Sequence, residues 1–407
     1  MARPAFVLGS GINAMWVARS LGRRLIPTYL FNQKPEDIAY HSRYVTACEY
    51  CDYSKAPDTI EQLKQAAGRL NAKPVVLIAT DSFLEIVSDH KEEISEFATV
   101  GLPATEIVNT VIDKGTFGEF CTTHELPAPS TWVVESQKQF DSCKAIANFP
   151  VILKPVVSHT AGQDKFLIDG AIPKVVVIED AAELERRYSE LKGSCTRFLV
   201  QEYIKGDDSN HYSYCSYWNS DLKEIAGAGI RKLRVHPIHG GIGTFAEIYN
   251  DSELVGAARE VVEKLGFTGI SSVCFKRDAR TGELRIHEMN GRFPTWHSAS
   301  HLCGIDLPYI AYQDMVGADV QRAKPVSAKG KWVSLKSDIR SFRQYRQAGE
   351  LGLFQWLRSL FQVRLMAEFA MDDWRPFVFF VGQILIRIWR RMISKVSTEL
   401  RLLPEKH

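Results

Sequence analysis

Short apolar runs alternate with longer amphipathic stretches over the first hundred residues. A strand, a glycine turn and a helix are predicted over residues 5–22, and further apolar runs follow at 25–31 and 74–80. Helical patterns are found at 58–71 and 82–97. Strands that alternate with helices are typical of parallel sheets built from right-handed βαβ units. We therefore predict a Rossmann-like α/β domain over residues 1–108.

The glycine turn of this first segment leaves two interpretations open. Gly9, Gly11 and Ala14 match the GxGxxA pattern of dinucleotide sites. The second strand, however, ends at residues 31–33 without the acidic residue that holds an adenosine ribose in such sites. A turn whose glycines only allow the strand and the helix to pack closely explains the pattern equally well.

After the first domain the pattern changes to shorter strands that alternate individually. An apolar strand at 149–155 contains a single lysine, and alternating segments at 211–219 and 224–235 are typical of antiparallel strands. The predicted boundaries are 109–325 for an α+β domain, 109–200 and 201–325 for its two subdomains, and 326–407 for a helical extension rich in basic and aromatic residues.

Composition narrows the class of protein. The 407 residues are 45% hydrophobic and 24% charged, with a formal net charge of +2, as in soluble globular proteins. This balance of charge argues against nucleic acid as a partner. Eight cysteines show no disulfide-scaffold spacing and the N-terminus shows no export signal, so we predict reduced thiols in the cytoplasm. The single Cys48-x-x-Cys51 pair leaves a zinc site as an alternative.

The strongest chemical signal is the segment ELRIHEMNGRF at 283–293. Glu288, Asn290 and Arg292 alternate along it, so a strand would place all three side chains on one face. The carboxylate and the amide oxygen suit a hard cation such as Mg²⁺, or Mn²⁺, and the guanidinium suits a phosphate or a carboxylate. A solvated edge strand is the alternative.

Other charged residues occur where a nucleotide could use them. Lys154 lies inside an apolar strand, where a buried cation needs an anion. Lys165 follows a glycine-containing loop and could close over the same phosphates. The backbone of residues 202–204 could bond an adenine edge, and Asp208 could reach ribose hydroxyls. A second group of positive charge follows at Arg231, Lys232 and Arg234.

The order of these motifs resembles the ATP-grasp superfamily. An Asp113-Lys114 pair is followed by PVILKP, QEYIKG and EMNGR. The last strands look most like those of carbamoyl phosphate synthetase and of the carboxylate–amine ligase branch, which D-aspartate ligase exemplifies. The resemblance covers residues 5–320 and implies a Rossmann-like domain followed by two α+β subdomains that clamp ATP between them.

The resemblance also implies roles for residues at matching positions. Glu288 and Asn290 would hold Mg²⁺, and Arg292 with Arg231 would stabilise the phosphorylated intermediate or orient the acid substrate. The residues that would bind ATP are Lys114, Lys154, Lys165, Gln201, Glu202, Tyr203, Ile204 and Asp208.

One position departs from the family pattern. An acidic residue or a glutamine usually provides a further metal ligand fourteen positions before the glutamate of the last motif, and here that position is Cys274. A thiol is a poor Mg²⁺ ligand, so an inactive relative is one of the alternatives.

The reaction implied is ATP-dependent ligation through an acyl phosphate, in which a carboxylate is phosphorylated and an amine then displaces the phosphate to form an amide. Two alternatives stay open. One is a bicarbonate-using carboxylase or carbamoyl-type enzyme, and the other is a non-catalytic nucleotide-binding protein.

The C-terminal extension has a pattern of its own. Residues 353–366 carry apolar side chains at helical spacing, and residues 377–393 are more apolar and contain Arg387, Arg390 and Arg391 in their second half. The uncharged run at 377–386 is shorter than the roughly 20 residues of a membrane-spanning helix. We predict a helix that lies on the anionic inner face of the membrane; packing on the domain, or on a second subunit of a homodimer, is the alternative.

Overall fold

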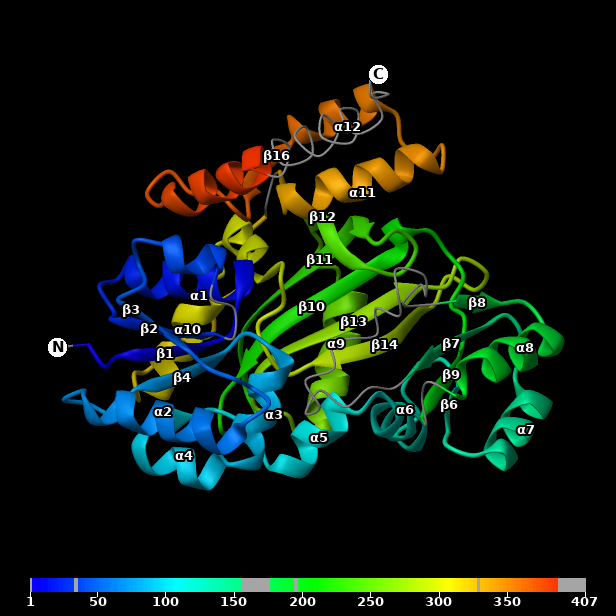
Figure 1. Ribbon diagram of the computed structural model, residues 1–407, viewed down its shortest axis with the longest axis horizontal. Helices are drawn as coiled ribbons and strands as arrows, with labels where there is room; N and C mark the ends of the chain where they lie inside the picture. The colour runs from blue at the N-terminus through cyan, green and yellow to red at the C-terminus, as the bar shows by residue number, and fades with distance from the viewer. Residues whose placement is uncertain (1, 33–35, 156–175, 194–196, 328–329, 387–407) are drawn as a thin grey trace, which may run out of the picture.

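The computed structural model describes residues 2–32, 36–155, 176–193, 197–327 and 330–386. The strands in these ranges form three sheets of five, four and seven strands that follow one another along the chain (Figure 1). The predicted fold class is confirmed, because a parallel α/β sheet comes first and antiparallel sheets with helices follow it.

The first sheet is entirely parallel, with the strand order β3-β2-β1-β4-β5. Alternate residues of β1 and β4 pack into hydrophobic clusters on opposite faces of the sheet, which explains why both strands are continuously apolar. The strands are β1 (Ala5–Leu8), β2 (Thr28–Asn32), β3 (Ala47–Tyr50), β4 (Val75–Ile78) and β5 (Thr99–Val100), and the helices are α1 (Gly11–Gly22), η1 (Ile38–His41), α2 (Ala56–Gly68), α3 (Asp81–Asp89) and α4 (Lys91–Phe97).

The glycine turn after β1 packs the strand against its helix. A Cβ on Gly9 would lie 2.9 Å from the Cβ of Ala79, which is too close for a larger residue. The backbone N–H of Gly11 donates to both carboxylate oxygens of Asp37, at 2.9 and 3.0 Å. A carboxylate of the chain itself therefore lies at the N-terminus of α1, where a dinucleotide phosphate would bind. Of the two interpretations of the GxGxxA pattern, the structure supports close packing.

The second sheet is small and antiparallel, with the order β6-β9-β7-β8. Two helices pack on one of its faces through Phe140 and Tyr188, whose stacked rings have centroids 3.9 Å apart. Leu153 joins this packing, so alternation turns Lys154 to the other face. The elements of this region are α5 (Thr105–Ile112), α6 (Lys114–Thr123), β6 (Thr131–Val134), α7 (Gln137–Ile146), β7 (Val151–Pro155), β8 (Val176–Ile178), α8 (Ala181–Leu191) and β9 (Phe198–Glu202).

The third sheet is the largest, with the order β14-β13-β10-β11-β12-β15-β16. Its long central strands run beside the first sheet at one end and the second sheet at the other (Figure 1). The elements are η3 (Asp208–Asn210), β10 (His211–Trp218), β11 (Glu224–His236), β12 (Ile242–Ile248), α9 (Ser252–Leu265), β13 (Gly269–Arg277), β14 (Leu284–Asn290), η4 (His297–Cys303), α10 (Leu307–Met315), β15 (Lys331–Val333), α11 (Leu335–Gln347), α12 (Leu353–Leu360) and β16 (Val363–Met366).

The C-terminal extension contains strands as well as helices. The helix predicted over 353–366 ends at Leu360, and β16 follows and pairs in parallel with β15. Val363 and Leu365 fit the period of a strand as well as that of a helix, so the local pattern does not distinguish the two structures. The free edge of β15 favours the strand, because β16 can pair with it. Residues 375–386 are helical. None of the helices in the described ranges has the length and the apolar character needed to cross a membrane.

His297 of η4 provides a test of how the core responds to acid. Its ring is fully buried, with Nδ1 2.8 Å from the carbonyl oxygen of Pro294, and burial lowers its pKa to about 4. The pKa of an unfolded histidine is about 6.5. Below pH 6.5 the unfolded chain therefore binds a proton that the folded chain does not, and stability is lost as the pH falls toward 4.

We expect the His297→Gln variant to be less sensitive to acid than the wild type. Between pH 7 and pH 4.5 its free energy of unfolding should fall by roughly 2 kcal/mol less than that of the wild type. Urea denaturation at the two pH values measures this difference. An equal fall in both proteins would show that His297 titrates normally in the folded state.

Candidate active site

Strand register gathers polar side chains on one face of the third sheet. Ser213 of β10 pairs with Cys274 of β13, which in turn pairs with Glu288 of β14. His211 and Lys232 share this face because side chains alternate along β10 and β11. Helix α9 packs on the opposite face. The polar face is therefore the one available to a ligand.

Glu288 lies at the centre of this cluster. Lys114 Nζ is 3.9 Å from Glu288 Oε2. Burial alone would raise the pKa of Glu288, but His287, Lys114 and Lys232 hold it well below its usual range. Burial lowers the pKa of His287 itself to about 3, so this imidazole is neutral near pH 7 and the lysines supply the stabilisation. Glu288 is thus an ionised carboxylate surrounded by cations.

Cys274 occupies the position where the family pattern led us to expect a metal ligand. It is the register partner of Glu288, Ser213 Oγ lies 3.3 Å from its Sγ, and Asn290 Nδ2 lies 4.0 Å from the same sulfur. Burial raises the pKa of the thiol, so Cys274 is a neutral thiol and not a thiolate. Opposite the carboxylate of Glu288 the sheet therefore presents a neutral thiol.

Arg231, predicted as a catalytic residue, lies on the opposite face of the sheet. It pairs in register with Tyr212, its Cζ lies 5.9 Å from the centre of that ring, and its Nε donates to the carbonyl oxygen of Ser209 at 2.7 Å. Lys232 lies on the face that carries Glu288: it is 7% exposed and its stem packs against Gly243, where a Cβ would lie 3.2 Å from Lys232 Cγ. The alternation of β11 is the physical reason why the two neighbouring residues lie on opposite faces.

Arg292 connects the third sheet to the first. Its Nε and Nη2 donate to the two carboxylate oxygens of Asp81, at 2.9 and 2.8 Å, and its Nη2 lies 3.3 Å from Asn290 Oδ1. Phe293 N–H donates to the carbonyl oxygen of Ile78 at 3.1 Å, which places the end of β14 beside the carboxyl end of β4. Sequence reasoning missed Asp81, although an acidic residue directly after a buried parallel strand is a usable signal.

The predicted adenine hinge lies where β9 leaves the second sheet. The backbone N–H groups of Glu202 and Tyr203 donate to carbonyl oxygens of neighbouring loops, both at 2.9 Å. The side chain of Gln201 is buried and donates to Thr131 Oγ1. The third hinge residue is Ile204, and its backbone N–H has no acceptor within the described part of the chain. Its position suits an acceptor atom on a nucleotide base.

Asp208, predicted as a ribose ligand, accepts hydrogen bonds from the C-terminal extension and from a nearby turn. Its Oδ2 accepts from Tyr345 Oη at 2.5 Å and from the backbone N–H of His239 at 2.9 Å. Only 7% of the residue is exposed. These bonds hold α11 and the turn before β12 against η3, and both of them use Oδ2.

Two further predicted lysines and two histidines concern the same region. Lys154 lies near enough to Glu288 to lower its pKa, whereas Lys165 lies outside the described residues. His211 and His287 were not predicted, yet their rings meet edge to face with centroids 5.8 Å apart. His287 directly precedes the motif's glutamate and could have been found from the sequence, whereas His211 required the register.

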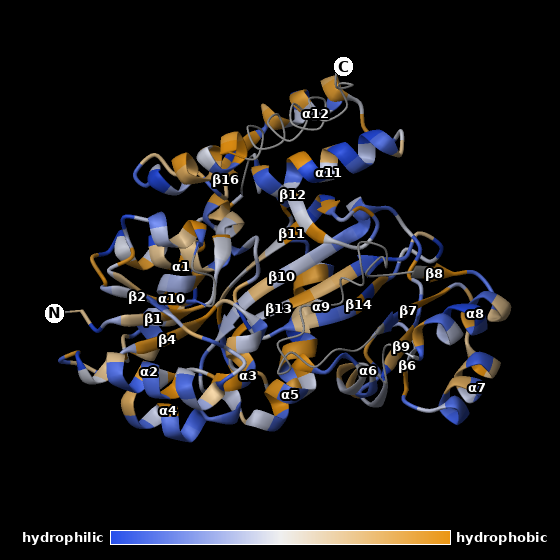
Figure 2. Ribbon diagram, in the orientation of Figure 1, coloured by the Kyte–Doolittle hydropathy of each residue, from blue (hydrophilic) through white to orange (hydrophobic). Residues whose placement is uncertain are grey.

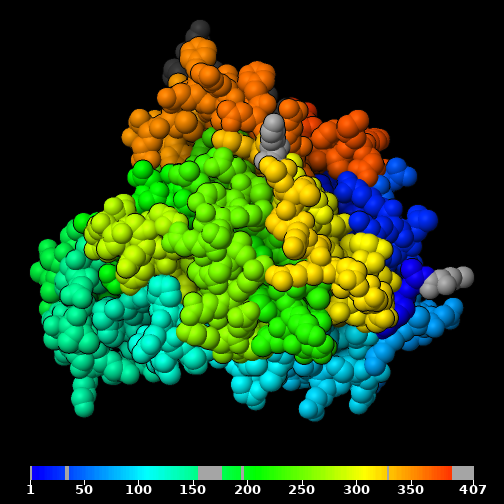
Figure 3. Space-filling view, turned by 180° about the vertical axis from the view of Figure 1, so that it is seen from behind, coloured from blue at the N-terminus to red at the C-terminus, as the bar shows by residue number. Residues whose placement is uncertain are grey.

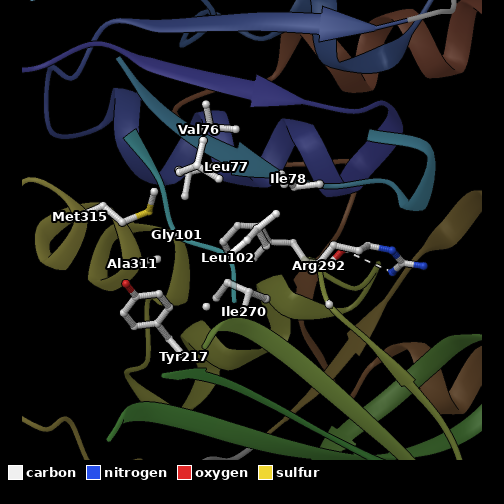
Figure 4. A pocket seen from close by; sticks show the side chains of 14 residues that line it. Val76, Leu77, Ile78, Gly101, Leu102, Tyr217, Ile270, Arg292, Ala311 and Met315 are labelled. Atoms are coloured by element: carbon white, nitrogen blue, oxygen red, sulfur yellow. Dashed lines mark hydrogen bonds between the residues drawn. The ribbon is translucent and has the colours of Figure 1, made fainter. Parts of the chain in front are cut away.

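A small cavity adjoins Arg292 between the first and third sheets (Figure 4). Its volume is about 20 Å³, and its lining is mostly apolar, with Leu77, Ile270 and Met315 among the residues around it. A cavity of this size holds about one water molecule. The Arg292 side chain extends away from it (Figure 4), so the chemistry belongs to the polar face and not to this cavity.

The Cys48-x-x-Cys51 pair gains no further ligands from its surroundings. In the described ranges, no three or more His, Cys, Asp or Glu side chains form a group that could hold a metal ion. Cys51 is buried, and burial raises the pKa of its thiol to about 12. This thiol is therefore protonated near pH 7, which does not favour the zinc alternative.

Several known proteins are similar to this chain. Residues 227–336 match the family model described as "ATP-grasp in the biosynthetic pathway with Ter operon". D-aspartate ligase from Enterococcus faecium (strain Aus0004) is 26% identical over 324 residues, which is 76% of each chain.

Solved structures share the fold at low sequence identity. N5-carboxyaminoimidazole synthetase from Staphylococcus aureus has a TM-score of 0.60 at 12% identity, covering 79% of this chain and 80% of that one. Biotin carboxylase from Campylobacter jejuni has a TM-score of 0.60 at 16% identity, covering 80% and 74%. The chain therefore resembles the ATP-grasp proteins, and among them the carboxylate–amine ligases.

Proposed function

We propose that this ATP-dependent ligase binds ATP between the second and third sheets and uses Mg²⁺ held by Glu288 and Asn290. The donor set fits the ion: Glu288 is an ionised carboxylate and Asn290 adds an amide oxygen, both of them ligands for hard cations. Mn²⁺ has similar preferences. The ion would neutralise charge on the phosphate oxygens during transfer.

The chain's own residues supply the rest of the phosphate site. Lys114, Lys154 and Lys232 direct positive charge toward Glu288, and this charge would balance a triphosphate. Ile204 N–H would bond the adenine. Lys165 is proposed to contact the same phosphates. Asp208 stays a proposed ribose ligand, because its bonds to Tyr345 and His239 use only Oδ2.

The reaction joins a carboxylate to an amine. An oxygen of the carboxylate attacks the γ-phosphorus of ATP, the bond to the bridging oxygen breaks, and ADP leaves. The amine nitrogen then attacks the acyl carbon, loses a proton, and expels inorganic phosphate to leave an amide. Arg292, oriented by its paired bonds to Asp81, would hold the acid or its phosphorylated form beside Asn290.

One observation carries this proposal: Glu288, ionised and ringed by lysines, lies in register with Cys274 at the end of the strand that leads to Arg292. ADP release in the presence of amino-acid pools, with mass spectrometry for an amide product, tests it. Product formation that needs both an acid and an amine is the expected result. ADP release with bicarbonate alone would favour the carboxylase alternative, and no ATP binding in calorimetry would favour a non-catalytic protein.

The Cys274→Glu variant tests the position of the missing ligand. A second carboxylate opposite Glu288 should strengthen Mg²⁺ binding, because oxygen donors suit this ion better than a thiol. We expect a lower apparent Kd for Mg²⁺ in the steady-state rate, and no such change in the Cys274→Ser control. A higher apparent Kd for Mg²⁺ in the folded Cys274→Glu protein would place residue 274 away from the metal.

We also propose that the protein acts in the cytoplasm on small-molecule substrates, as a homodimer, and that its C-terminal extension reaches the inner face of the membrane. One solved structure with this fold, the biotin carboxylase domain of Hydrogenobacter thermophilus 2-oxoglutarate carboxylase, is described as a dimer. Sedimentation of the purified protein tests the oligomeric state.

A further inference from the structure

Exposed apolar side chains are concentrated in the C-terminal extension. Eleven of the sixteen large apolar residues that are strongly exposed in the described ranges fall between residues 353 and 386. Phe354, Phe361 and Met371 are 86%, 88% and 88% exposed. Figure 2 shows apolar residues on α12 and on residues 375–386, in the outermost layer of the molecule. Such a concentration is unusual for a surface that meets only water.

These side chains form stripes along the two helices. On α12 the exposed apolar residues are at positions 353, 354 and 357, and 361 follows directly after the helix, so they recur once per turn. Around residues 375–386 they are at positions 374, 378, 381 and 385, again at helical spacing. Both helices therefore turn an apolar stripe outward.

The opposite sides of the same helices are firmly attached to the protein. Trp356 stacks on Phe342 with ring centroids 4.6 Å apart and donates to Asp338 Oδ2 at 2.8 Å. Asp373, just before the second helix, forms a buried ion pair of 2.8 Å with Arg19 of α1. The extension is thus held in place, and its outer stripes are exposed as a consequence of the fold.

The charge around these stripes is predominantly positive. Between residues 335 and 386, seven exposed side chains are basic and two are acidic. One of the two acidic residues, Asp372, is paired with Arg23 at 2.7 Å. Arg358, Arg364 and Arg375 lie next to the apolar stripes in the sequence. The surface therefore complements one that is both apolar and negatively charged.

We propose that this face, made by α12 and residues 369–386, docks on a bilayer that contains anionic lipids. The exposed aromatic and aliphatic side chains would enter the boundary between headgroups and acyl chains, and the arginines would contact the headgroups. The proposal extends the predicted membrane helix of 377–393 to α12. It does not depend on the ligase activity, because the stripes and the polar face around Glu288 are separate.

Flotation of the full chain with lipid vesicles tests the proposal. Vesicles of phosphatidylcholine with phosphatidylglycerol should carry the protein to the top of the gradient, and added salt should weaken this binding. The Phe354→Ser/Phe361→Ser variant should bind these vesicles about tenfold less. Ile146→Ser is the matched control, since Ile146 is 63% exposed on α7, and it should float like the wild type.

Three outcomes would overturn the proposal. In the first, the wild type fails to float, and in the second, the double variant floats as well as the wild type. In the third, the wild type does not bind vesicles but self-associates in sedimentation, whereas the double variant does not self-associate. This last result would assign the face to a second copy of the chain. ADP release without vesicles should be equal in the wild type and the double variant. If neither the wild type nor the double variant released ADP, the ligase proposal would be contradicted, and the flotation result would be unaffected.

Discussion

Glu288→Gln should lose almost all ligation at ordinary Mg²⁺ concentrations. The amide has nearly the same shape as the carboxylate but is neutral, and a neutral oxygen is a weaker ligand for a hard cation. The lysines that hold the pKa of Glu288 low would also lose the anion they surround. We expect kcat/KM to fall by about 10²–10³-fold, the scale typical for loss of one electrostatic contact to a reacting group.

A magnesium titration distinguishes metal binding from other effects of this substitution. If Glu288 is a ligand, raising the Mg²⁺ concentration should restore part of the activity. Glu283→Gln is the matched control, because Glu283 is exposed at the other end of the same segment, and it should behave like the wild type. Wild-type activity of a folded Glu288→Gln protein at low Mg²⁺ would contradict the assignment.

The second large effect concerns the rate, which should depend on Lys232 and not on its neighbour Arg231. Lys232→Met removes a charge from the polar face while keeping the length of the stem that packs on Gly243. We expect kcat to fall by about 10²-fold, since a cation directed at the phosphates stabilises charge in the transition state. Arg231→Met should leave kcat close to that of the wild type, because Arg231 lies on the other face against Tyr212.

Thermal melting of both variants completes this comparison. Arg231→Met should lower the melting temperature, since it loses a hydrogen bond to Ser209 and packing on Tyr212. Its kcat should stay close to that of the wild type. If Arg231→Met abolished turnover while Lys232→Met did not, the register of β11 would be wrong, and the sequence-based choice of Arg231 would be restored.

Much of the fold follows from local patterns. The alternation of strands and helices in the first hundred residues predicts a parallel sheet because helices cover both of its faces. Glu288, Asn290 and Arg292 could be singled out because a polar series at the end of an apolar strand has few structural explanations. Lys154 could be singled out for a similar reason, as a cation in an apolar run.

Other features depend on contacts between distant segments. The choice between Arg231 and Lys232 depends on which face of β11 meets α9, which no local pattern encodes. The bond from Tyr345 to Asp208 could not be predicted from local sequence, because Tyr345 lies far along the chain in the extension. The strand β16 forms because β15 offers an edge, whereas its own sequence also suits a helix.

The central claim is that the carboxylate is activated as an acyl phosphate before the amine attacks. Once the amino-acid screen has identified the acid, that acid labelled with ¹⁸O in its carboxylate tests the claim directly. Mass spectrometry of the inorganic phosphate should then find one ¹⁸O atom for each amide formed, because a carboxylate oxygen leaves with the phosphate. Phosphate that carries no ¹⁸O while amide accumulates would contradict an acyl phosphate and with it this account of the active site.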